Sequence, residues 1–435
     1  MSTTELGNID ATKLDRKRAK AIIAGSLGNA VEFVDWAVYT TFSSVFAHHF
    51  FPPGNDTAAL LSTLAIFAVG FAIRPIGAAV MGAYADRRGR KKGLVLTIGL
   101  MAGATLVIGL SPSYSQVGLA APIILVVARI VQGFAAGGEF GTASAFLVES
   151  ATAGRRAFAG SWQQVSVGAG ILIASGMGTI VTTVLPKSAV DNWGWRLAFV
   201  VAAMLGLVGL WLRRSVDETD SFHRGESRVS DSPRPGNAFV RMLRDHPKAA
   251  LRVFAINIGG VVLYNVWITY MPTYAKVSTG IPLNRALLAN VIGLITFIVL
   301  LPFAGMLSDK VGRKPTLMAF SGGFLIFAWP AFRFLGGGFW TLLVIQIVGL
   351  VLLLGYSANV AAVMAEQFPP EVRATGIGLP YALAVAIFGG TAPYLTTWMT
   401  TSGHGNRVWL YCAIAAAIGV VVYLTMPETK GKRLD

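Results

Sequence analysis

Two acidic residues occur in an apolar stretch near the start of the chain, where an ordinary exposed carboxylate is not expected. Glu32 and Asp35 are three positions apart, so a helix places both side chains on one face. An ionised carboxylate in the middle of a bilayer costs at least about 2.5–3.5 kcal/mol, and such residues are candidates for function. A carboxylate in this setting can load and release a proton. The pair therefore predicts a proton site.

Two arginines occur in the apolar stretches that follow. Arg74 lies in the second stretch, and Arg129 begins a polar series with Gln132 and Glu139 in the fourth. Helical steps of about 100° put Gln132 and Glu139 within about 20° of each other, with Arg129 roughly 60–80° away. An anion bound at an arginine would change the proton affinity of a nearby carboxylate, which is the chemistry of symport. The alternative is a static buried ion pair that orders the helices.

These considerations give two sets of candidates for the transport site. The proton-coupling candidates are Asp35, Glu32, Arg129 and Glu139. Buried amides require hydrogen-bond partners, whereas aromatic residues at helical spacing more often serve packing. Arg196, near the outer end of its predicted helix, either attracts anions or anchors the interface. The substrate-binding candidates are Arg74, Arg129, Gln132, Gln163, Gln164, Arg196, Tyr264, Asn265, Asn359 and Tyr381.

A thirteen-residue loop that occurs twice organises the chain around these helices. Residues 82–94 and 305–317 share six identical positions, including the Gly, Asp, Gly, Arg and Lys at the same spacings. A second repeat follows the fourth and tenth apolar stretches, where a Glu precedes an Arg-Ala pair at one spacing. Charged groups on tight turns can pair across one face of the membrane, and such pairs would form a gate. The predicted gate residues are Gly82, Asp86, Gly89, Arg90, Glu149, Arg156, Asp309, Gly312, Arg313, Glu366 and Arg373.

The composition indicates a membrane protein. Of the 435 residues, 54% are hydrophobic and only 13% are charged. Apolar stretches long enough to cross about 30 Å of hydrocarbon recur along the whole chain. The net charge of +15 does not indicate a nucleic-acid partner, because the basic residues are spread over loops. The sequence has no phosphate-binding loop, no zinc-protease motif and no serine-hydrolase motif, so we expect neither an enzyme nor a bound metal or cofactor.

The expected fold class is an all-α membrane protein of twelve transmembrane helices in two pseudo-symmetric six-helix bundles. Basic residues concentrate in alternate loops, which predicts that both termini lie in the cytoplasm. The expected parts are an N-terminal tail (1–20), a first bundle (21–212), a cytoplasmic linker (213–248), a second bundle (249–426) and a C-terminal tail (427–435). The expected partners are the lipid bilayer and a small molecule, and the expected state is a monomer.

Several motifs resemble the major facilitator superfamily, and more narrowly its metabolite:proton symporter family. The duplicated loop resembles the gate motif of the superfamily, and Arg129 to Gly133 resembles its helix 4 proton-coupling motif. Residues 28–35, 74–77, 132–139 and 193–196 resemble the narrower family, and residues 46–55 and 211–219 resemble its 2-oxoglutarate branch. The resemblance implies a bacterial inner-membrane proton symporter for a small organic anion, with a co-transported proton as the only coupling partner. Zwitterionic osmolytes and shikimate-like acids remain alternative substrates, and a channel or sensor is a further alternative.

Overall fold

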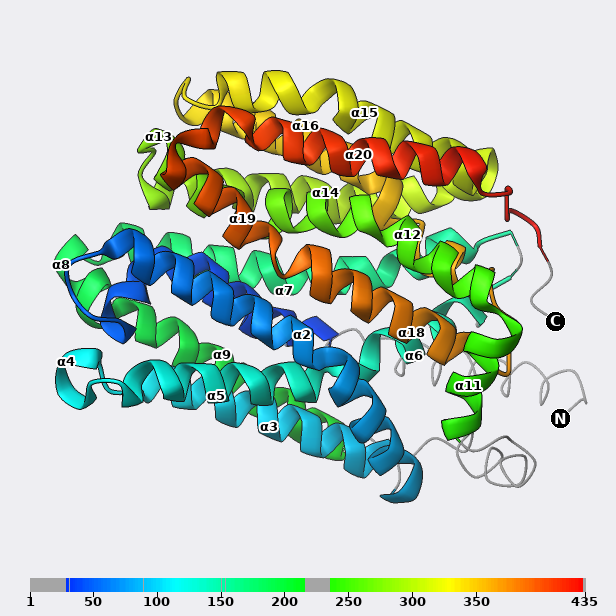
Figure 1. Ribbon diagram of the computed structural model, residues 1–435, viewed down its shortest axis with the longest axis horizontal. Helices are drawn as coiled ribbons and strands as arrows, with labels where there is room; N and C mark the ends of the chain where they lie inside the picture. The colour runs from blue at the N-terminus through cyan, green and yellow to red at the C-terminus, as the bar shows by residue number, and fades with distance from the viewer. Residues whose placement is uncertain are drawn as a thin grey trace, which may run out of the picture.

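The computed structural model describes residues 29, 30, 32–88, 90–149, 151, 152, 154–215 and 235–432. All regular secondary structure within these ranges is helical. The helices run roughly parallel to the long axis of the molecule and form two groups, one from each half of the chain (Figure 1). We call the end next to residues 426–432 the inner end and the opposite end, where α4, α8 and α13 lie, the outer end.

The N-terminal group begins with a helix over residues 32–50. Two-residue turns and short loops then connect long apolar helices, most of which cross the full length of the group. The later elements are α2 (Asp56–Arg88), α3 (Arg90–Leu110), α4 (Tyr114–Val117), α5 (Ala120–Ala135), α6 (Glu139–Glu149), α7 (Arg156–Val184), α8 (Lys187–Ala189) and α9 (Trp195–Ser215).

The C-terminal group is preceded by α11 (Pro235–Asp245), a short amphipathic helix within the expected linker. Several spans of the C-terminal group consist of two consecutive helices separated by a short interruption. The remaining elements are α12 (Pro247–Tyr264), α13 (Met271–Thr279), α14 (Leu283–Val311), α15 (Arg313–Phe334), α16 (Phe339–Ser357), α17 (Val360–Ala365), α18 (Arg373–Ala384), α19 (Ala392–Met399) and α20 (Val408–Thr425).

Eight apolar stretches among the described residues are long enough to cross a membrane, and one of them, Arg373–Thr425, contains two spans. Two shorter apolar helices, Val95–Leu110 and Ala120–Ala135, and the helix over residues 32–50 complete twelve. The described residues therefore account for the twelve expected helices. The part of the expected first bundle before residue 29 lies outside the described residues.

Several of the described spans contain an interruption of the α-helix. The fourth span changes to a 3₁₀ turn at Ala136–Gly138, and wider π-turns occur at Asn265–Tyr270 and Val385–Gly389. Such turns re-aim side chains and release backbone carbonyls, and they are frequent at functional sites. The released carbonyls of Trp267 and Ile268 are bonded by Gln346 and Asn290.

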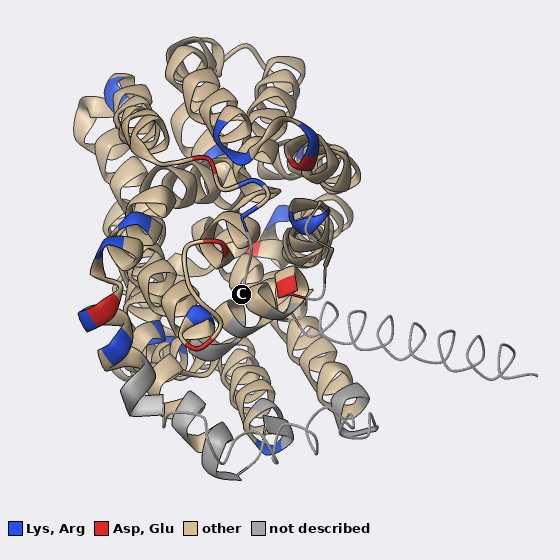
Figure 2. Ribbon diagram, turned by 90° about the vertical axis from the view of Figure 1, so that its right-hand side faces the viewer, with Lys and Arg blue, Asp and Glu red and all other residues tan. Residues whose placement is uncertain are grey.

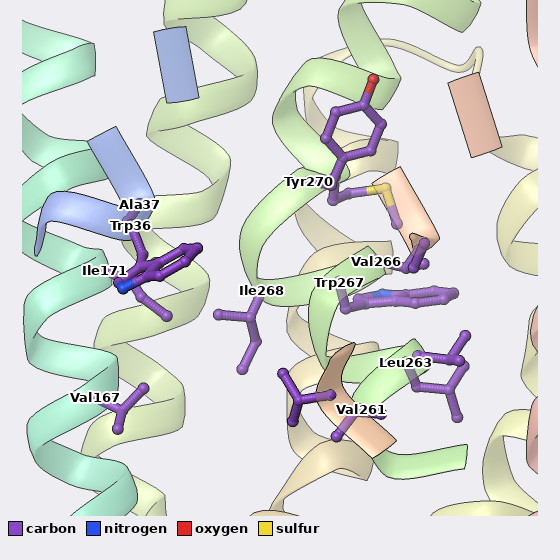
Figure 3. Close-up of a cluster of buried hydrophobic side chains, with 14 of the residues drawn as sticks. Trp36, Ala37, Val167, Ile171, Val261, Leu263, Val266, Trp267, Ile268 and Tyr270 are labelled. Carbon is purple, nitrogen blue, oxygen red and sulfur yellow. The ribbon is translucent and has the colours of Figure 1, made fainter. Parts of the chain in front are cut away.

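The two groups meet along an apolar interface in the centre of the molecule. Helix α7 of the first group lies along α14 of the second. Figure 3 shows part of the buried cluster, with Trp36 and Ile171 on one side and Ile268 and Trp267 on the other. Lipid provides no hydrophobic force between helices, so close packing of this kind is what holds such bundles together.

Glycines bring α2 and α5 into direct backbone contact. A Cβ added at Gly133 would lie 1.9 Å from the Gly70 carbonyl oxygen, and one at Gly77 would lie 2.0 Å from the Phe134 carbonyl oxygen. The two helices can approach this closely only because neither position carries a side chain. This contact fixes the distance between the arginine of α2, Arg74, and the polar residues of α5.

Candidate functional site

Asp35 lies at the centre of a buried polar network in the N-terminal group. Its Oδ1 accepts a hydrogen bond from Thr105 Oγ1 at 2.5 Å and another from Gln132 Nε2 at 2.9 Å. The carbonyl of the same Gln132 side chain accepts a hydrogen bond from Arg129 Nη1 at 2.8 Å. Gln132 thus links the carboxylate to the arginine. Gln132 and Arg129 come from α5, the fourth span, as expected, whereas Thr105 of α3 was not among the predicted residues.

Arg129 is fully buried, and besides its bond to Gln132 it is held by aromatic rings, with no ion pair to a described residue. Its guanidinium carbon lies 3.9 Å from the ring centre of Tyr39 and 4.4 Å from that of Trp36. Contacts of this type are worth about 2 kcal/mol or more where the cation is removed from water. They compensate in part for placing the charge inside the bundle.

Trp36 contacts a second arginine as well. The guanidinium carbon of Arg74 lies 4.1 Å from the centre of the Trp36 ring system, and its Nη2 lies 3.9 Å from Glu32 Oε1. One indole therefore lies against both arginines of the predicted site. Trp36 was not among the predicted site residues. Its place directly after Asp35, in the same helix as Glu32, was the available signal.

A cavity of about 50 Å³ lies between the two helix groups, and we call it the central cavity. Polar side chains from both groups line it: Arg74 and Gln164 from the first, and Tyr264, Asn265 and Tyr381 from the second. Three of them carry a buried polar atom without a hydrogen-bond partner among the described residues, namely Arg74 Nε, Gln164 Oε1 and the Tyr264 hydroxyl. A buried polar group without a protein partner is a candidate for contact with water or a ligand.

Five predicted substrate-binding residues do not line the central cavity. Two of them, Arg129 and Gln132, belong to the Asp35 network. The other three make hydrogen bonds elsewhere. Gln163 accepts a hydrogen bond from Ser144 at 2.6 Å, and Asn359 donates to Thr316 Oγ1 at 2.8 Å. Arg196 donates from Nη1 to the carbonyl oxygens of Gly109 and Ser111 at the outer end of α3. None of the three lines the central cavity described above. Helix rotation, which a single sequence does not reveal, separates these side chains from Gln164 and Asn265.

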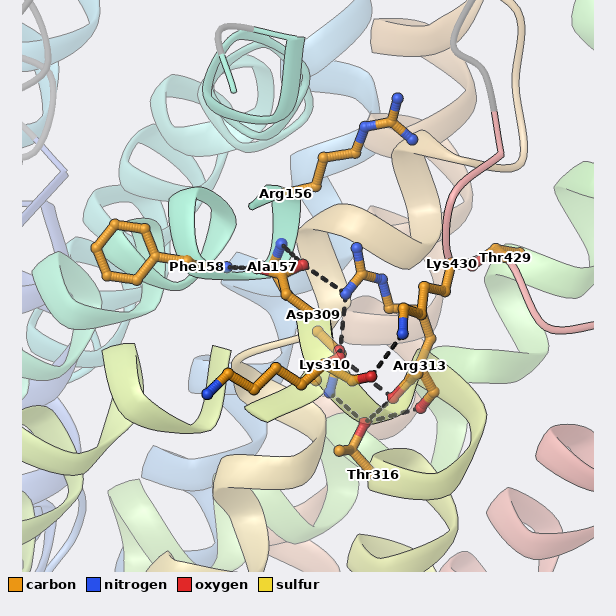
Figure 4. A network of polar contacts seen from close by, with 12 residues as sticks. Arg156, Ala157, Phe158, Asp309, Lys310, Arg313, Thr316, Thr429 and Lys430 are labelled. Carbon is orange, nitrogen blue, oxygen red and sulfur yellow. Dashed lines mark hydrogen bonds and ion pairs between the residues drawn. The ribbon is translucent and has the colours of Figure 1, made fainter. Parts of the chain in front are cut away.

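The second copy of the duplicated loop forms a network at the inner end (Figure 4). Asp309 accepts hydrogen bonds from the backbone N–H groups of Ala157 and Phe158 at the start of α7, at 3.1 and 3.0 Å. A carboxylate at a helix N-terminus is stabilised by the unpaired N–H groups and the helix dipole. Arg313 Nη1 binds the same carboxylate at 2.7 Å. The loop of one group therefore caps a helix of the other.

Two further ion pairs join the groups at the inner end. Arg373 Nη1 lies 2.5 Å from Glu149 Oε1, and Arg156 Nη1 lies 3.6 Å from Glu366 Oε1. Arg313 Nη2 also reaches Glu366, at 3.3 Å. Figure 2 looks onto this end and shows basic and acidic residues gathered at the helix ends. The predicted gate residues of the second half are thus in contact with Glu149 and Arg156 of the first.

Most side chains of the first copy of the loop, residues 82–94, lie outside the described residues. The side chains of Gly82, Asp86, Gly89 and Arg90, and that of Glu139, lie outside the described residues. Gly312, the matching glycine of the second copy, has a φ of +113°, a conformation that L side chains rarely adopt. A Cβ there would also lie 2.7 Å from Glu428 Oε2.

A segment that the sequence analysis did not select completes this network. Glu428 accepts hydrogen bonds from the backbone N–H groups of Arg313 and Lys314, each at 2.9 Å, at the start of α15. Thr429 Oγ1 donates to Glu366 Oε2 at 2.5 Å. Lys432 Nζ donates to the Glu366 carbonyl oxygen at 2.9 Å. The acidic residue in a basic tail was the available signal.

With this geometry in place, comparison with known proteins decides the family. The sequence pattern of the family described as "Sugar (and other) transporter" matches residues 21–234 and again residues 220–435. The chain belongs to this transporter family. It is therefore a transporter and not an enzyme, and its fold is that of the major facilitator superfamily, as predicted.

Several members of the family have similar sequences over almost their whole length. The chain is 35% identical to alpha-ketoglutarate permease of Escherichia coli K12 over 96% of this chain and 95% of that protein. It is 35% identical to a citrate-proton symporter of Klebsiella pneumoniae, over 94% and 92%. It is 33% identical to a glycine betaine, proline, ectoine and pipecolic acid transporter of Dickeya dadantii, over 98% and 86%.

Solved structures of family members agree with the fold. The proton:xylose symporter of Escherichia coli, bound to 6-bromo-6-deoxy-D-glucose, superposes with a TM-score of 0.72 over 95% of this chain and 96% of that one. The two sequences are 20% identical. At that identity the likeness establishes the fold of this transporter and leaves its substrate open.

Proposed function

We propose that this transporter is a proton symporter that carries a small organic anion, 2-oxoglutarate or a similar di- or tricarboxylate, by alternating access. The observation that carries the proposal is the convergence of Arg74 Nε, Gln164 Oε1 and the Tyr264 hydroxyl on the central cavity, each without a partner in the described part of the chain. An arginine with a free donor is the group best suited to hold a carboxylate. The names of two similar proteins support an organic acid.

Asp35 carries the proton. Substrate binding changes the proton affinity of Asp35 through Arg74, Trp36 and Arg129. A carboxylate bound at Arg74 weakens the positive field at Trp36 and at the network of Asp35. Neutralising part of that field favours the protonated acid, so substrate and proton bind together. We further propose that the inner end faces the cytoplasm of a bacterium, because the described basic residues concentrate there.

A zwitterionic osmolyte is the second candidate, and the aromatic lining of the central cavity favours it. Phe33, Trp36, Phe71, Phe140 and Tyr381 all line the cavity. Aromatic faces bind quaternary ammonium groups through cation–π contacts. The similarity to osmolyte transporters agrees with this alternative.

Radiolabelled uptake into proteoliposomes distinguishes the two candidates. The purified protein is reconstituted, an inward proton gradient is imposed, and 2-oxoglutarate, citrate, shikimate and betaine are offered with and without an uncoupler. We expect uncoupler-sensitive accumulation of a dicarboxylate or tricarboxylate, abolished in Arg74→Ala. Accumulation of betaine alone would replace the first candidate by the second, and uptake that ignores the uncoupler in every case would refute proton coupling.

A further inference from the structure

A second and smaller cavity lies entirely within the N-terminal group, and we call it the bundle cavity. Its volume is about 20 Å³. The helix over residues 32–50 together with α3, α5 and α9 surrounds it, and it shares no lining residue with the central cavity. Its lining residues include Glu32, Asp35, Thr97, Thr105 and Ala202.

The size and lining of the bundle cavity fit one water molecule. A cavity of roughly 10–15 Å³ or more holds a water when two to four polar partners are present. Thr105 presents a hydroxyl group, and Glu32 and Asp35 present carboxyl groups. Asp35 is 4% exposed, and its Oδ2 has no hydrogen-bond partner in the described chain, whereas Oδ1 is occupied by Thr105 and Gln132.

The bundle cavity extends from Asp35 toward the inner end. Thr97 is eight residues nearer to that end of α3 than Thr105, a distance of about 12 Å along a helix. Gly206 and Gly209 line the cavity on the inner side of Ala202 in α9. Trp36, Arg74 and the substrate-facing groups line the other cavity, on the opposite side of the first helix.

We propose that the bundle cavity binds the water through which Asp35 releases its proton to the inner side, by a route separate from that of the substrate. The Asp35 acid transfers its proton from Oδ2 to the water, which becomes hydronium, and the carboxylate remains. The charged and titratable groups around this carboxylate are Glu32 and Tyr39 of its own helix, Arg74 of α2 and Arg129 of α5. The two arginines hold the carboxylate once the proton has left. The role of Asp35 as proton carrier rests on the proposed function.

The test follows hydrogen exchange at the Asp35 acid by infrared spectroscopy of the full-length protein in lipid, without any substrate. The carboxylic acid band of Asp35 is the band that Asp35→Asn removes, and its shift after transfer from H₂O to D₂O reports access of water. Ala202→Val adds two carbons to the bundle cavity. Ala203→Val adds the same two carbons at the next position of α9, a buried residue that does not line the cavity.

We expect Ala202→Val to slow the shift by about tenfold or more, because expelling the water removes the relay. Ala203→Val should leave the rate near that of the wild type. Equal rates in both variants would overturn the separate route. If Ala202→Val does not fold, Ala102→Val fills the bundle cavity from α3, and an unchanged rate there would overturn it equally. If no band is lost in Asp35→Asn, the proton-carrier role itself fails, which is a distinct result.

Discussion

The ring of Phe140 in α6 stacks on the ring of Tyr381 in α18, with centroids 3.8 Å apart and planes inclined by 8°. The two residues come from different helix groups, and both line the central cavity. The stack therefore joins the two groups at the wall of the cavity, about 12 Å along α18 from Arg373 at the inner end. An aromatic pair of this kind contributes about 0.5–1.5 kcal/mol beyond the area it buries.

Replacing Phe140 by Ala is predicted to open the inner side of the cavity. Loss of the stack removes about 0.5–1.5 kcal/mol of stabilisation. The fraction of molecules whose cavity is open on the inner side would then rise roughly two- to tenfold. The measurement is the alkylation rate of a cysteine placed at Asn265, in a background with Cys412→Ser. Phe254→Ala is the matched control, because Phe254 contacts Phe388 within the C-terminal group. Equal labelling of both variants would show that the stack has no closing role.

The contact between α2 and α5 predicts a large difference between two glycine substitutions. Gly133→Ala places a methyl group 1.9 Å from the Gly70 carbonyl oxygen, so the helices must separate. Overpacking typically costs about 1–3 kcal/mol, and we expect a lower Tm together with loss of transport because Arg74 is displaced. Gly103→Ala is the control, since a Cβ at Gly103 meets nothing within 4 Å. A Tm equal to that of the control would contradict the observed backbone contact.

The glutamine between the acid and the arginine predicts a split between two transport assays. Gln132→Leu keeps a similar volume but removes the hydrogen bonds to Asp35 and from Arg129. Hydrogen bonds to charged groups contribute about 1.5–3 kcal/mol, so proton-driven uptake should fall roughly tenfold or more. Substrate exchange between preloaded vesicles and medium needs no net proton movement, and we expect it to persist. An equal loss in both assays would indicate general misfolding instead of broken coupling.

The tail contact predicts a loss of stability in acid. Burial tends to raise the pKa of Glu428, but backbone hydrogen bonds from Arg313, Lys430, Lys314 and Thr429 outweigh it and hold the pKa below its ordinary value of 4.5. A lowered pKa in the folded state stabilises the protein above the unfolded value, and this contribution is lost as the pH falls through the folded pKa. Between about pH 6 and about pH 3.5, the Tm of the wild-type protein should therefore fall by more than the Tm of Glu428→Gln. Parallel Tm curves would show that the carboxylate does not stabilise the tail.

The sequence predicted the polar chemistry of the first half well, because charge in an apolar helix is conspicuous. Asp35, Arg129 and Gln132 were selected by type and helical spacing, and the structure brings them together through hydrogen bonds. Asn359 was selected on the same ground, but its amide is satisfied within the C-terminal group by Ser308, Thr316 and Gly355. A buried amide in a sequence predicts that it has a hydrogen-bond partner, but it does not predict which residue that partner is.

Contacts made across the two halves could not be predicted in detail. Nothing in the local sequence indicates that Phe140 faces Tyr381, because their distance depends on how two separately folded groups dock. The same holds for Glu428, which reaches α15 only after the chain has crossed the membrane for the last time. The second copy of the duplicated loop makes the kind of contact between the groups that its charges predicted, since Asp309 bonds the start of α7.

The residues around Glu366 determine which of its contacts break when the two helix groups separate at the inner end. Arg156 belongs to the N-terminal group, whereas Arg313, Thr429 and Lys432 belong to the other group or its tail. When the groups separate, Glu366 gives up one cation and keeps the rest of its shell. Asp309 and Glu149 differ from Glu366 in this respect. Separation removes the α7 N–H groups from Asp309 and removes Arg373 from Glu149.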